Sequence, residues 1–201
     1  MPKGFDRIQT RGDTGKGKER EGPKPLDLTR LRSSEVSSTQ DTNHALVAAE
    51  KVQQKYTNLQ SKHEKEYQGL EKEIKQLELS IKTKLANALR QHPRDEDIQN
   101  ASKTYIKTKR EYDNITKKRI AEDASLSSYI TEQEGEISKI LEITSFSPKK
   151  KVQEIQSIAE GIEDKIEKNH QKRLLYTAIY KDYIQPISNT LDSKEASGSS
   201  T

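Results

Sequence analysis

Two short segments contain residue types that could carry chemistry. The segment from Gly12 to Lys16 has glycines and a lysine of the kind that cradle phosphates, but its spacing is wrong and no Ser or Thr follows the lysine. His63 and Glu64 match the start of the His-Glu-x-x-His pattern, in which two histidines one helical turn apart bind Zn²⁺. Tyr67 stands where the second histidine is needed. Neither segment therefore predicts a phosphate or metal site.

The other histidines, His44, His92 and His170, are far apart in the sequence. No Gly-x-Ser-x-Gly segment marks a nucleophile, and most carboxylates have a lysine three or four residues away, as on a solvated helix face. We therefore predict no enzyme activity, no metal, no cofactor and no small-molecule substrate. His63 is predicted to lie in a helix seam, where a polar ring helps to set the register.

Composition indicates what kind of element carries these residues. Among 201 residues only 29% are hydrophobic, 34% are charged, and there is no Cys or Trp. Such a chain suits long helices that bury one stripe rather than a thick core. Without cysteine there is no disulfide or thiolate site, and no stretch approaches the roughly 20 apolar residues of a membrane span. A soluble, cytoplasmic or nuclear protein is expected.

The net charge of +4 is concentrated at the N-terminus. Residues 1–34 contain nine Lys and Arg against five Asp and Glu, which accounts for the whole excess. The remainder is neutral with interleaved signs, whereas nucleic-acid-binding proteins concentrate positive charge. Nucleic acid is therefore an unlikely partner for the body of the chain, and the basic arm keeps it open as an alternative.

The predicted fold is all-α, with three long helices in an elongated antiparallel coiled-coil or helical-bundle arrangement. Residues 1–43 are predicted to form a disordered basic arm, residues 44–191 the helical bundle, and residues 192–201 a disordered tail. Helices of this length would make a rod of about 60 to 75 Å.

The first helix has the clearest seam. Its apolar positions recur about every 3.6 residues, which favours nearly straight helices packed antiparallel within one chain over a parallel zipper. Pro93 should end this helix, and the carboxylates from Asp95 to Asp97 suit the start of the second. The second seam weakens between Lys117 and Asp123, where we expect the poorest packing. The seam comprises Val52, Tyr56, Leu59, His63, Tyr67, Leu70, Ile74, Leu77, Ile81, Leu85 and Ala88.

Ser147 and Pro148 predict the start of the third helix, as an N-cap hydroxyl followed by proline at the first helical position. With the two lysines that follow, the segment also resembles the target site of proline-directed cyclin-dependent kinases. That resemblance implies phosphorylation of Ser147. A phosphate there would lie at a helix N-terminus, near Lys149 to Lys151.

The third helix carries more apolar residues near its end than one neighbouring helix can cover. One interpretation is a partner-binding face, because tyrosine-rich apolar patches favour interfaces. The other is that the first two helices enclose this end as the best-packed core. Pro186 is expected to bend the chain and to mark the far edge of the patch. The predicted partner-binding residues are Leu175, Tyr176, Ile179, Tyr180, Tyr183 and Ile184.

Two further resemblances concern partners. Pro25 to Thr29 resembles the docking peptide of the C-terminal-binding-protein corepressors, and its leucines are of the kind that fold onto a partner. The three long helices are similar to the crescent of BAR domains, which implies binding to anionic membranes through a basic face. The neutral body lacks such a face, so a membrane surface is less favoured.

The expected function is that of a non-enzymatic coiled-coil scaffold or adaptor subunit of a multiprotein assembly. The expected setting is cell division, which the kinase-like site favours, or cytoskeletal organisation. Protein partners and self-association are both expected. A BAR-like peripheral membrane module and a nucleic-acid-associated protein acting through its basic arm remain the alternatives.

Overall fold

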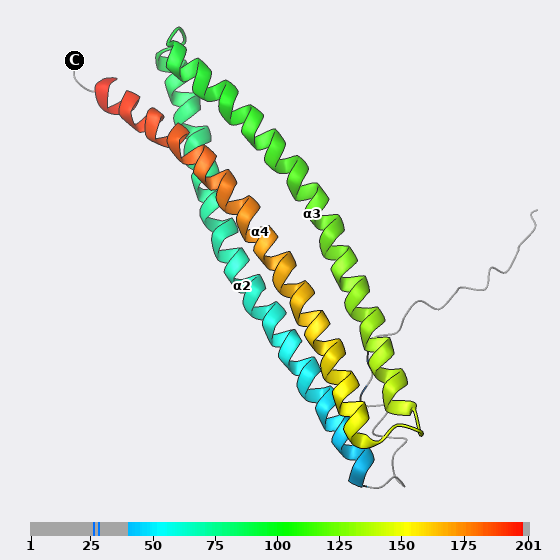
Figure 1. Cartoon of the computed structure of the whole chain (residues 1–201). Coiled ribbons are helices and arrows are strands. Elements are labelled where there is room, and N and C mark those ends of the chain that lie inside the picture. The colour runs from blue at the N-terminus through cyan, green and yellow to red at the C-terminus, as the bar shows by residue number, and fades with distance from the viewer. Residues whose placement is uncertain (1–25, 27, 29–39, 199–201) are drawn as a thin grey trace, which may run out of the picture.

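The computed structural model describes residues 26, 28 and 40–198. They form an elongated all-α bundle of three long helices, which confirms the predicted fold class (Figure 1). The helices are α2 (Gln40–Gln91), α3 (Glu96–Glu142) and α4 (Pro148–Gly198). With 52, 47 and 51 residues, they are about 70 to 78 Å long at the usual helical rise.

Consecutive helices run antiparallel, so α4 runs parallel to α2 (Figure 1). The most extensive packing is between α2 and α4, whereas α2 and α3 contact each other much less. Hydrogen bonds between α2 and α4 join residues that are 102 to 109 positions apart in the sequence, the extremes being Glu78 with Tyr180 and Glu64 with Arg173. Helices that follow one another in the chain therefore pack antiparallel, whereas α2 and α4, which have the most extensive contact, run parallel.

Local signals end and begin the helices where the sequence predicts. Pro93 lies in the turn after α2. Asp95 caps α3, its carboxylate accepting from the backbone N–H of Asp97 at 2.9 Å and of Ile98 at 3.4 Å. Ser147 caps α4, its hydroxyl accepting from the N–H of Lys150 at 3.2 Å. Each cap satisfies backbone donors that the first helical turn leaves unpaired.

The predicted seam of α2 is the core of the bundle. Tyr56, Ile74 and Ile81 are buried against the other two helices. In the weak stretch of α3, Ile120 is 65% exposed while Arg119 turns inward and is only 7% exposed. Packing is therefore irregular there, as expected.

The predicted domain boundaries need correction at both ends. α2 begins at Gln40 rather than at residue 44, and the remainder of the predicted arm, apart from Leu26 and Leu28, lies outside the described residues. The prediction of a disordered tail from residue 192 is wrong as far as Gly198, where α4 ends. Lys194 holds these last turns by ion pairs to Asp95 and Asp97, at 3.0 and 2.9 Å.

Pro186 does not mark the end of the packed region. α4 continues through it, and Ile187 and Leu191 beyond it are buried. The helix curves in its C-terminal half, which contains Pro186 (Figure 1). Pro186 itself faces solvent, where the loss of one backbone hydrogen bond is tolerated with a bend.

Candidate functional site

The six predicted partner-binding residues separate into two groups. Tyr180 and Ile184 are buried, at 3% and 0% exposure, and belong to the core at this end of the bundle. For these two the enclosed-core interpretation holds. The other four are large apolar side chains that remain exposed. They are Leu175 at 58%, Tyr176 at 39%, Ile179 at 41% and Tyr183 at 65%.

Tyr180 is held by specific contacts to both other helices. Its ring stacks on Tyr112 of α3 with centroids 3.9 Å apart, and its hydroxyl donates to Glu78 Oε1 of α2 at 2.7 Å. Lys109 Nζ of α3 lies 3.4 Å from the same carboxylate. Burial, and next the hydrogen bond to Glu78, raise the pKa of the Tyr180 phenol. Tyr180 is thus a structural junction of three helices.

The four exposed residues form a stripe on the side of α4 away from the bundle. Leu175, Ile179 and Tyr183 follow each other at four-residue spacing, which places them on one helix face, and Tyr176 lies beside them. Lys168 and Lys172, both exposed, precede the stripe by one to two turns. We call the four apolar residues the α4 stripe.

Two of the lysines expected to meet a phosphate on Ser147 already have other partners. Lys151 is 8% exposed, and its Nζ donates to the carbonyl of Leu141 at 2.9 Å. The ammonium of Lys150 lies 3.9 Å from the centroid of the Phe146 ring. The expectation that Lys149 to Lys151 act together on the phosphate is therefore wrong for Lys151, whose ammonium is committed to closing the turn after α3.

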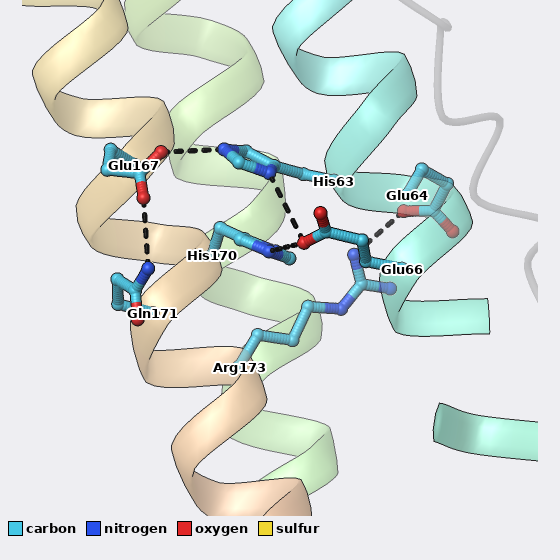
Figure 2. Close-up of polar contacts among 7 residues, drawn as sticks. All are labelled: His63, Glu64, Glu66, Glu167, His170, Gln171 and Arg173. Atoms are coloured by element: carbon cyan, nitrogen blue, oxygen red, sulfur yellow. Dashed lines mark hydrogen bonds and ion pairs between the residues drawn. The ribbon is translucent and has the colours of Figure 1, made fainter. Parts of the chain in front are cut away.

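The structure brings together two histidines that lie far apart in the sequence. His63 of α2 and His170 of α4 stack with ring centroids 3.7 Å apart and planes 11° from parallel. His63 Nε2 lies 2.7 Å from Glu167 Oε2, and His170 Nε2 lies 2.9 Å from Glu66 Oε2. Figure 2 shows the Glu66 carboxylate reaching both rings. His63 is a seam residue as predicted, but His170 is not an isolated histidine.

Charges around this pair favour the ionised carboxylates. The hydrogen bond from His170 is the main cause that lowers the pKa of Glu66. For Glu167 the hydrogen bond from Gln171 lowers the pKa most, followed by that from His63. Arg173 donates to Glu64 at 2.8 Å at the edge of the cluster (Figure 2). We call His63, Glu66, Glu167 and His170 the histidine cluster.

A buried carboxylate joins α3 to the N-terminal part of α2. Glu134 of α3 is 8% exposed, and it accepts hydrogen bonds from the Tyr56 hydroxyl and, at 3.1 Å, from the backbone N–H of Leu26. Leu26 itself is 7% exposed and packs against Leu46 and neighbouring core residues. This leucine of the predicted docking peptide is therefore buried against the chain's own bundle.

Sequence reasoning missed the histidine cluster because it searched for ligands within one helix. The only available signal was the occurrence of His63 and His170 at seam positions of two helices, and the offset between those helices is a property of their packing. No family model, curated protein or solved structure matches this chain. Among the described helices, none is long and apolar enough to cross a membrane.

Proposed function

We propose that this protein is a non-enzymatic scaffold or adaptor subunit that binds a helix of another protein through the α4 stripe. The observation that carries the proposal is the exposure of four large apolar side chains on one face of a well-packed helix. Tyrosine and aliphatic side chains clustered in this way are enriched in protein interfaces. The four-residue spacing of Leu175, Ile179 and Tyr183 matches the seam of an amphipathic partner helix.

Charge favours a partner with acidic residues over a second copy of this chain. Lys172 is exposed and continues the face that carries the stripe, as does Lys168, which has 73% of its side chain exposed and also forms a surface ion pair with Asp164 at 2.7 Å. In a parallel pairing with a second copy these lysines would face each other. In an antiparallel pairing centred on Ile179 they would lie opposite the region after Pro186, where the next positions on this face are uncharged. An acidic amphipathic helix would pair with them.

The test compares three proteins purified from the native cell with their bound partners. Ile179→Glu introduces a charge in the middle of the stripe, whereas Ala178→Glu introduces the same charge at an adjacent exposed position about 100° around the helix. The proposal expects a stoichiometric partner that the wild type and Ala178→Glu retain and Ile179→Glu loses. Circular dichroism confirms that both variants remain helical.

Three results would count against this function. If Ile179→Glu keeps every partner that the wild type binds, the stripe is not the interface. If Ile179→Glu instead changes the oligomeric state measured by sedimentation and leaves the bound proteins unchanged, the stripe joins two copies of this chain. Binding to anionic vesicles that high salt abolishes would favour a peripheral membrane protein.

Phosphorylation of Ser147 belongs to the same proposal as a regulatory step. Ser147 caps α4, so its hydroxyl lies beside backbone N–H groups and the positive end of the helix dipole. A phosphate there would strengthen this interaction. Incubation with a proline-directed kinase and peptide mass spectrometry tests the site, with Ser147→Ala as the control.

A further inference from the structure

The histidine cluster contains a nitrogen that the protein leaves without a partner. His63 Nε2 lies 2.7 Å from Glu167 Oε2, and a carboxylate is an acceptor, so the ring proton belongs on Nε2. The lone pair of the neutral ring is then on Nδ1. That atom is buried, and it has no hydrogen-bond partner among the described residues. Its ion-pair neighbour, Glu66 Oε2, is another acceptor, 3.9 Å away.

One lone pair, on His63 Nδ1, is buried, and the other belongs to the more exposed carboxylate of Glu66, so a positive charge between the two acceptors would be favoured. A proton on Nδ1 does not bridge them, because 3.9 Å is well beyond hydrogen-bond length. A metal ion does, because it sits about 2 Å from each ligand atom. His170 Nε2 is also at hand, 2.9 Å from the same Glu66 oxygen.

We propose that His63, Glu66 and His170 bind a divalent transition-metal ion, with Zn²⁺ as the ion that this set of donors suits best. Two imidazole nitrogens and one carboxylate oxygen form a three-residue zinc set that leaves a fourth position open. One ligand atom from each of the three residues lies within 4.8 Å of the other two. Figure 2 shows the three side chains converging from α2 and α4.

Two of the three ligand-atom separations are already close to those of a zinc site, but the histidine rings stack with planes 11° from parallel, so one ring has to turn before both lone pairs point at one ion. Ligand atoms around tetrahedral Zn²⁺ are about 3.3 Å apart, between the 2.9 Å and 3.9 Å that separate Glu66 Oε2 from the two histidine nitrogens. His63 and Glu66 are three residues apart on α2 and therefore share a face. On binding, the His170–Glu66 hydrogen bond gives way to two bonds to the ion, and the neutral His170 ring carries its proton on Nδ1.

The surroundings of the triad also suit a cation. Glu167 accepts the Nε2–H of His63, which is the carboxylate–histidine support that zinc ligands commonly have. An open pocket beside the rings, lined in part by Asp123, Ser127 and Asn169, gives water access to the two histidines. The carboxylates of Glu64, Glu66, Glu167 and Asp123 outnumber the nearby cations Lys62, Arg119 and Arg173, so the site favours positive charge.

An ion at this position would join α2 to α4 in the middle of the rod. Binding to the folded state alone stabilises it by mass action, so the melting temperature should rise with ion concentration. The site is distinct from the α4 stripe, and its failure would leave the proposed function untouched.

The test uses the full-length, tag-free protein after dialysis against a chelator. Titration with Zn²⁺ in a calorimeter should show one ion per chain. Co²⁺ should give the visible absorption of a four-coordinate nitrogen and oxygen site, and Zn²⁺ should abolish it. At about a hundredfold excess over Kd, Zn²⁺ should raise Tm by about 5 °C or more.

Variants separate the site from surface binding. Glu66→Gln and His170→Asn each remove a ligand and should weaken Zn²⁺ binding at least tenfold. Glu167→Gln removes only the support of His63 and should weaken binding by about 10- to 100-fold. His44→Gln changes an exposed histidine outside the cluster and should bind like the wild type.

The proposal is overturned if the wild-type protein binds no Zn²⁺ and gives no Co²⁺ spectrum. It is equally overturned if Glu66→Gln and His170→Asn bind as tightly as the wild type. If the loss of the buried His170 unfolds the bundle, the result for Glu66→Gln decides whether the site binds Zn²⁺, because Glu66 is exposed and its replacement leaves the fold intact.

Discussion

The same small change at two tyrosines of α4 should have very different effects on stability. Tyr180→Phe keeps the ring on Tyr112 but removes the hydroxyl that donates to Glu78 at 2.7 Å. A hydrogen bond to a charged group contributes about 1.5 to 3 kcal/mol, so the free energy of unfolding should fall by about that amount. Tyr183 is 65% exposed, and Tyr183→Phe should change it by less than about 0.5 kcal/mol.

A double-mutant cycle isolates the bond to Glu78. Glu78→Gln removes the charge that both the Tyr180 hydroxyl and Lys109 Nζ approach. Because Tyr180 and Glu78 are in contact, the two changes together should cost less than the sum of the single changes, by about 1 kcal/mol or more. Urea unfolding followed by circular dichroism at one protein concentration measures all four proteins.

Glutamate substitutions at Tyr180 and Tyr183 test which of the two tyrosines belongs to the core and which to the exposed surface. Tyr180→Glu puts a second carboxylate beside Glu78 in the core and should cost more than about 3 kcal/mol, a large part of the stability of a typical domain. Tyr183→Glu should leave the fold intact. The reasoning is refuted if the two Phe variants are equally stable, or if Tyr183→Glu unfolds the protein while Tyr180→Glu does not.

Two further predictions concern the helix caps. Ser147→Ala should lower the free energy of unfolding by about 1 kcal/mol in urea denaturation, because it removes the hydroxyl that accepts from the Lys150 N–H, and Ser147→Asp should restore it. Asp95 has a lowered pKa, mainly through its hydrogen bond with Lys194, so it stabilises the fold above its unfolded pKa, and that contribution is lost as the pH falls through the lower folded value. The melting temperature should therefore fall less between pH 7 and pH 3 in Asp95→Asn than in the wild type. An equal fall in the two proteins would contradict this prediction. Asp182→Asn serves as the control at an exposed residue.

The sequence alone determined the elements of this fold. Helix ends depend on neighbouring residues, so the turn at Pro93, the cap at Asp95 and the start at Ser147 could all be predicted. The seam of α2 could be predicted for the same reason, since helical periodicity alone places its apolar residues on one face. For the segment from Leu175 to Ile184 the sequence predicted two alternatives, a partner-binding face or an enclosed core. It could not choose between them, because the apolar arc of this segment is wider than one neighbouring helix can cover.

The tertiary structure decided what depends on how the helices lie against each other. Packing of α4 between its neighbours buried Tyr180 and left Tyr183 in solvent. It also set the offset that stacks His170 on His63 across 107 positions of the sequence, a distance over which no local pattern operates. The last turns of α4 are helical for a similar reason, since Lys194 pairs with the cap of a different helix. Local preferences determine where a helix begins and ends, whereas burial and charge pairing between helices determine which of its residues meet.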